Sequence, residues 1–175
     1  MKNESKEILL NSILENLHKS TLSIPVLEGY KVSDQKTGAI MVAIDKDHSV
    51  EQFLEDGPMN ENESFEDRIE KVIKETQTSM IMNGLQNEEL KLLGDLKTKL
   101  FHFRLYLQDN IQKDVQIRQI NAYFIEPESN YFYELSLAAP PLKIYDINDF
   151  VTDNLMHLIK PILKNIRYNE NNPIK

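Results

Sequence analysis

Between Glu89 and Ala139 apolar residues recur at every second position, and this period constrains the fold more than any other feature of the sequence. A period of two is typical of β-strands, whose successive side chains point to opposite faces of a sheet. Turn-forming residues separate predicted strands over Leu90–Leu93, Leu96–Leu107, Val115–Ile125 and Tyr131–Ala139, with turns at Gly94-Asp95 and Asp109-Asn110. Because short turns join antiparallel neighbours, we expect an antiparallel sheet.

Amphipathic helices are predicted near both ends of the chain and before this sheet. The apolar spacing over Glu4–Lys19 predicts an N-terminal helix. Ser64 is a suitable N-cap for a second helix, which Asn83-Gly84 would end and which we expect to lie across the sheet. A closing helix contains Pro161, which is expected to kink it.

The segment between the first two helices is predicted to hold two strands and a loop. Thr21–Ile24 is a candidate strand, and Gly38–Ile44 is apolar on both alternating faces, which is typical of a central strand. The stretch from Asp45 to Glu63 is acidic and is broken by Gly57-Pro58. It predicts a mobile surface loop, with one helical turn around Val50–Leu54.

The length of 175 residues and the 41% hydrophobic content favour one domain with a substantial core. We expect an N-terminal helix over 1–20, a single α/β domain over 21–168 and a polar tail over 169–175. The fold class is therefore α/β in the α+β sense, with an antiparallel sheet packed against amphipathic helices.

The two faces of the predicted sheet differ in composition. One is apolar and is assigned to a helix-covered core of Phe101, Phe103, Leu105, Leu107, Ile120, Ala122, Phe124, Tyr133, Leu135 and Leu137. The opposite face mixes aromatic, aliphatic and polar side chains: Leu100, His102, Arg104, Tyr106, Ile117, Gln119, Asn121, Tyr123, Phe132, Glu134 and Ser136. A solvated face would carry mostly Lys, Glu and Thr.

Interfaces between proteins are enriched in Tyr, Phe and Arg, so the mixed face is a candidate surface for a partner. The predicted partner-binding residues are Arg104, Tyr106, Ile117, Gln119, Asn121, Tyr123 and Phe132. The alternative is that the N-terminal helix or the acidic loop covers this face and that its polar residues hydrogen-bond to one another.

The charge and composition of the chain argue against several classes of function. A net charge of -8 without a long basic run argues against nucleic-acid partners, and zero cysteines exclude thiolate chemistry, disulfides and Cys-type zinc sites. The N-terminus lacks the features of a signal peptide, and no window has eighteen consecutive apolar residues. We therefore expect a soluble cytoplasmic protein that does not insert into a membrane.

No catalytic motif stands out. The sequence has no Gly-x-Ser-x-Gly elbow, phosphate-binding glycine loop or zinc helix, and its four histidines are not at ligand spacing. We expect no metal, no cofactor and no enzymatic activity. An enzyme acting on a small molecule is the alternative from another class, and a deep pocket that holds His102, Arg104 and Glu134 together would favour it.

In their order along the chain, several short motifs resemble the PsbP/Mog1/DcrB superfamily. They are Leu-Ser-Ile-Pro-Val-Leu-Glu-Gly-Tyr at 22–30, the apolar strand 38–44, Ser-Phe-Glu-Asp at 64–67, the Gly94 turn before the strand 96–107, and the closing helix. The likeness covers about residues 21–168. Tyr30 stands where that family has Trp, and the N-terminal helix and the long acidic segment are additions.

The resemblance implies an α/β sandwich that binds other proteins and does not catalyse a reaction. Among its branches, the cytosolic adaptor chaperones of secreted bacterial effectors fit a small acidic chain best. The sequence therefore predicts an adaptor or chaperone whose partner is an effector segment, with a homodimer as a further expectation. A toxin-neutralising immunity protein that uses the acidic loop over 51–67 and a structural subunit of an assembly are the alternatives.

Overall fold

The computed structural model of this chain describes residues 6–9, 22–26, 31–33, 41–43 and 49–168, except 87–88, 127–129 and 145–148. For the residues before Pro58 and for Tyr168 the backbone alone is described. Within these ranges the chain forms antiparallel β-sheets and two helices, which confirms the predicted α+β class.

The main sheet is antiparallel at every pairing of neighbouring strands. In spatial order its strands are β3 (Lys31–Ser33), β4 (Met41–Ala43), β5 (Ser49–Pro58), β9 (Tyr131–Ala138), β8 (Val115–Glu126), β7 (His102–Gln112) and β6 (Leu90–Lys97). A short strand, β10 (Leu142–Lys143), also pairs with β8. The segment from Glu89 to Ala139, in which apolar residues alternate, thus forms the half of the sheet that ends at β6.

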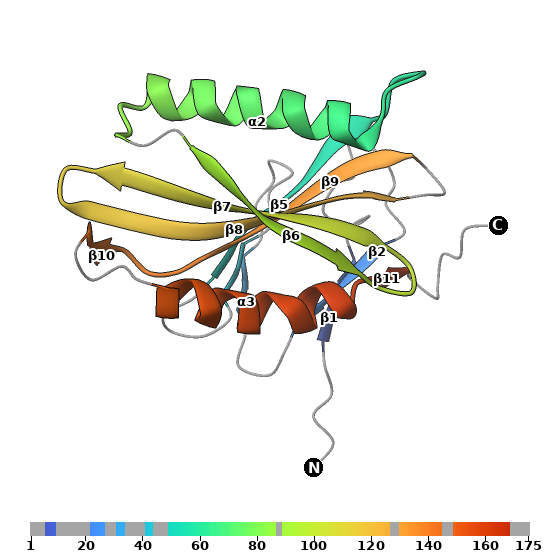
Figure 1. The fold of residues 1–175 in the computed structure, drawn as a ribbon. Helices are drawn as coiled ribbons and strands as arrows, with labels where there is room; N and C mark the ends of the chain where they lie inside the picture. The colour runs from blue at the N-terminus through green and yellow to red at the C-terminus, as the bar shows by residue number, and fades with distance from the viewer. Residues whose placement is uncertain are drawn as a thin grey trace, which may run out of the picture.

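The two helices cover opposite faces of this sheet, α2 (Phe65–Met82) above it and α3 (Asp149–Lys164) below it in Figure 1. The side facing α3 is the predicted core, and all ten residues assigned to it are buried there. Leu155, Ile159 and Ile162 of α3 pack against them, and Pro161 lies inside the helix as expected. Alternation along the strands was therefore sufficient to find the main core.

The predicted N-terminal helix is wrong at its start. Lys6–Leu9 form β1, which pairs antiparallel with β2 (Leu22–Val26), and β11 (Arg167–Tyr168) pairs with the other edge of β2. A short apolar run fits a strand as well as a helix, so the backbone pairing with β2 decides its conformation. The remainder of that prediction lies outside the described residues.

The predicted acidic loop is also wrong over most of its length. Residues 49–58 form β5, which pairs with β4 on one side and with β9 on the other, and they contain no helical turn. The register shifts between Val50 and Gln52 and again between Glu55 and Pro58. Such irregularities let a strand carry turn-forming residues, which is why local composition predicted a loop here.

Two predicted turns lie inside strands instead. Gly94, with φ 134°, lies at a shift in the register between β6 and β7. Asp109 and Asn110 are part of β7. The chain reverses at Thr98, whose backbone N–H donates to the Phe101 carbonyl at 2.8 Å, and again at Lys113, with φ 58°. Glycine is favoured both in turns and at β-bulges. Gly94 therefore predicted a turn in the sequence, although it lies at a bulge in β6.

Candidate functional site

Helix α2 lies over the face that the sequence predicted to bind a partner. Tyr123 and Phe132 are fully buried and form a second cluster with Ile69 and Val72 of α2. Asn121 is buried as well. A helix therefore covers this part of the face, but it is α2, and the alternative reading had named the N-terminal helix or the acidic loop instead. The prediction that Asn121, Tyr123 and Phe132 lie on a surface exposed to a partner is wrong.

The other four predicted residues keep partial exposure: Arg104, Tyr106, Ile117 and Gln119. The ring of Tyr106 contacts the ring of Tyr123 edge-on at 5.9 Å between centroids, so it belongs to the margin of the α2 cluster. Gln119 lies in a groove between α2 and the sheet. A binding role for these four residues stays a prediction.

This groove has a volume of about 480 Å³ and runs between the second half of α2 and strands β7, β8 and β9. Its helix side and the following turn contribute Val72, Glu75, Thr76, Ser79, Met80, Asn83 and Leu85. Its sheet side contributes Gln108, Asn110, Gln119 and Glu134. We call it the amide groove, because three primary amides form its floor.

The amides of the groove belong to one hydrogen-bonded network. Gln108 Nε2 donates to Asn110 Oδ1 at 2.9 Å, and Asn110 Nδ2 donates to Gln119 Oε1 at 3.0 Å. Gln119 Nε2 then donates to Asn121 Oδ1 at 2.8 Å, and Asn121 Nδ2 donates to Gln108 Oε1 at 2.7 Å. Ser136 Oγ also donates to Asn121 Oδ1, at 2.8 Å. The network holds these side chains in fixed positions on the sheet.

A network of amides presents both hydrogen-bond donors and acceptors to a ligand. Asn110 Nδ2 carries a second hydrogen for which no described residue supplies an acceptor. Glu75 and Glu134 add negative charge to the lining. The groove therefore suits a ligand that offers both donors and acceptors and that is neutral or basic.

Sequence reasoning found Gln119 and Asn121 but missed Gln108 and Asn110. The dipeptide Asp109-Asn110 was assigned to a turn, which ended the predicted strand too early. Gln108 pairs directly with Gln119 across β7 and β8, so the alternation that includes Tyr106 continues through both missed residues. Extending the period of two by four positions would have identified them.

The opposite end of α2 holds a cluster of charged side chains. Asp95 of β6 accepts from Arg104 Nε at 3.0 Å and lies 2.7 Å from His102 Nε2. The hydrogen bond from Arg104, followed by that with His102, lowers the pKa of Asp95 despite partial burial. The Arg104 guanidinium also lies over the Phe65 ring at 5.5 Å, which connects the sheet to the first turn of α2.

The structure does not bring His102, Arg104 and Glu134 together. His102 lines a pocket beside the β6–β7 turn, whereas Glu134 lines the amide groove. Arg104 is held by Asp95. The arrangement that would have favoured an enzyme is therefore not found among these three residues.

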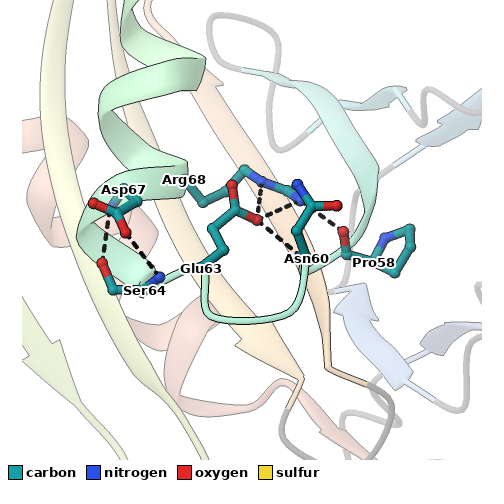
Figure 2. A network of polar contacts seen from close by, with 6 residues as sticks. All are labelled: Pro58, Asn60, Glu63, Ser64, Asp67 and Arg68. Carbon is teal, nitrogen blue, oxygen red and sulfur yellow. Dashed lines mark hydrogen bonds and ion pairs between the residues drawn. The ribbon is translucent and has the colours of Figure 1, made fainter.

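Figure 2 shows how the start of α2 is attached to the sheet. Arg68 is buried, and its guanidinium donates to the Pro58 carbonyl at 2.6 Å and to Glu63 Oε1 at 2.8 Å. Glu63 Oε1 also accepts from the Asn60 backbone N–H at 3.1 Å. These bonds join the end of β5, the connecting turn and the helix into one unit.

The described residues contain no group of three His, Cys, Asp or Glu side chains placed to hold a metal ion. No described helix is long and apolar enough to cross a membrane. The amide groove is a site in which side chains from helix and sheet converge around a cavity.

Comparison with protein-family models, with curated proteins and with solved structures gave no match. The resemblance to the PsbP/Mog1/DcrB superfamily therefore stays a prediction from the sequence, and the function must be argued from the site.

Proposed function

We propose that this protein is a non-enzymatic binding module that holds a segment of another protein in the amide groove. The observation that carries the proposal is that Gln108, Asn110 and Gln119, which share one hydrogen-bonded network with the buried Asn121, line a cavity of about 480 Å³. A cavity of this volume falls within the range of about 300–1,000 Å³ that is usual for ligand sites.

The chemistry of the groove supports a polypeptide ligand. A peptide backbone offers one donor and one acceptor per residue, and primary amides can satisfy both. Val72, Met80 and Leu85 supply apolar surface for the side chains of the segment. Because Glu75 and Glu134 line the same groove, the segment is expected to be neutral or basic.

The biological role that we propose is a bacterial cytosolic adaptor or chaperone for a secreted effector. It is supported by the resemblance described above and by the combination of apolar and amide side chains that such a protein needs. The immunity-protein alternative relied on an acidic loop over 51–67, but residues 51–58 belong to strand β5, which pairs with β9, and 65–67 begin α2. Deleting the segment would remove part of the sheet, so deletion cannot separate the two roles.

Point substitutions in the amide groove test the proposal. Peptides that tile the protein encoded beside this one would be titrated into the wild type and into N110A/Q119A, with binding followed by fluorescence polarisation. The variant is expected to bind the best peptide at least about tenfold more weakly, since it loses two hydrogen-bonding side chains.

Gln112→Ala is the matched control, because Gln112 is an exposed residue of the same strand and does not line the groove. It should bind as the wild type does. Unchanged affinity of a folded N110A/Q119A variant for the best peptide would refute the proposed site.

A further inference from the structure

A second pocket lies beside the first turn of α2, at the opposite end of the helix from the amide groove. Its volume is about 430 Å³. Apolar and cationic residues dominate its lining, which consists of Phe65, Lys97, Thr98, Lys99, Leu100, Phe101, His102 and Ile125. We call it the turn pocket, because most of its lining comes from residues 97–102, which include the turn from β6 to β7 at 98–101.

The turn that lines this pocket is held by hydrogen bonds from one side chain. Thr98 Oγ1 accepts from the Phe101 backbone N–H at 3.0 Å and from the Leu100 N–H at 3.3 Å. Phe101 is 4% exposed, and its ring contacts the rings of Phe103 and Phe124 in the main core. The pocket is therefore preformed, with one wall continuous with the core.

The turn pocket carries more positive than negative charge. Lys97 and Lys99 are exposed, and neither forms an ion pair with a side chain that the structure describes. The nearby cation Arg104 is instead compensated by Asp95 and Glu66. Among the described residues, these two ammonium groups thus have no side-chain counterion, and they lie next to apolar walls in a chain whose net charge is -8.

We propose that the turn pocket binds a small monocarboxylate with an apolar body, such as a medium-chain fatty acid. The apolar body would contact Phe65, Leu100 and Ile125, and the carboxylate would lie near Lys97 and Lys99. Apolar burial supplies most of the attraction, and the two ammonium groups select a charged head group over a neutral one. This site does not depend on the proposed function, because it is built from different residues.

Octanoate and 1-octanol are suitable probes, since they share an alkyl chain and differ in charge. We expect octanoate to shift the backbone ¹H–¹⁵N resonances of residues 97–102 and of Phe65, and calorimetry to show 1-octanol binding about tenfold more weakly. Equal affinities for the two probes, or shifts confined to other regions, would overturn the proposal.

Two variants make the test specific. K97Q/K99Q should lower the affinity for octanoate to that for 1-octanol, whereas the control K91Q/K160Q, which changes two exposed lysines outside the pocket, should not. Leu100→Asp, at a side chain that is 42% exposed, should abolish octanoate binding without unfolding the protein. An equal loss in the control, or retained binding in Leu100→Asp, would contradict the site.

Discussion

Arg68 illustrates how one residue can determine the placement of a helix. Its side chain is 4% exposed, and the guanidinium bonds both to Glu63 and to the Pro58 carbonyl. A buried charge is tolerated only when hydrogen bonds replace the water that it loses. Arg68 therefore fixes α2 against the end of β5.

Substitution of Arg68 should be costly. Arg68→Ala leaves Glu63 and the Pro58 carbonyl without their cation, so the free energy of unfolding should fall by about 3 kcal/mol. Urea denaturation would measure the change. Lys74→Ala is the control, because the Lys74–Glu70 pair at 3.5 Å is largely exposed and should contribute little. Equal effects of the two substitutions would contradict this role.

The same cluster predicts a dependence of stability on pH. The hydrogen bond from Arg68, followed by that from the Asn60 N–H, lowers the pKa of Glu63 below its ordinary value of 4.5. A carboxyl with a lowered folded pKa stabilises the protein above its unfolded pKa and loses that contribution as pH falls through the folded one. Stability should therefore decrease below about pH 4.5.

Glu63→Gln should flatten this part of the pH profile while lowering stability at pH 7, because the amide does not titrate. Thermal denaturation at a series of pH values would show it. A profile for Glu63→Gln as steep as that of the wild type would assign the acid sensitivity to other carboxyls.

The two described glycines with positive φ should differ in their tolerance of side chains. Gly94 has φ 134° and Gly84 has φ 71°, and a Cβ at either position would meet no atom within 4 Å. The cost of substitution is therefore conformational. Gly94→Ala should lower the free energy of unfolding by about 1–3 kcal/mol, whereas Gly84→Asn should be nearly neutral, since Asn tolerates this helix-ending conformation. Urea denaturation of both variants would check the difference.

At the scale of elements, the ends of α2 are encoded locally. Ser64 Oγ accepts from the Asp67 N–H at 3.0 Å, and Asp67 Oδ2 accepts from the Ser64 N–H at 3.1 Å. At the other end the Gly84 N–H donates to the Ile81 carbonyl at 3.0 Å. Both ends were predicted from the sequence, because capping depends on residues within one turn.

Removal of the N-cap tests the contribution of this local signal. Ser64→Ala should lower the free energy of unfolding by about 1 kcal/mol and speed amide exchange in the first turn of α2. Ser79→Ala, an exposed change within the same helix, is the control. A larger effect at Ser79 than at Ser64 in urea denaturation would show that the cap is not the main determinant.

At the scale of the whole molecule, the two helices are attached by clusters of different size. The α3 side buries a large cluster around Phe103, Phe124 and Leu155, whereas the α2 side is described by the smaller one around Tyr123 and Phe132. Since local opening depends on how much apolar surface is exposed, α2 should detach from the sheet at a lower free energy than global unfolding.

Native-state hydrogen exchange would measure this difference. Amides of α2 are expected to exchange at least about tenfold faster than those of β7, β8 and β9 at low denaturant. Opening of α2 would expose the predicted binding residues that it covers. Exchange of α2 and the sheet with one common free energy would show instead that both layers unfold together.

The sequence by itself determined the strands from 115 to 138, the assignment of side chains to two faces, the ends of α2 and the presence of a closing helix around Pro161. Each depends on alternation or capping, which are properties of neighbouring residues. The tertiary structure alone decided that 49–58 is a strand, that Lys6–Leu9 pairs with β2, and that α2 covers the mixed face. These outcomes depend on contacts between distant segments, whose free energies can outweigh local preference. The amide groove exists for that reason, because its lining combines residues of α2 and the following turn with residues of three strands.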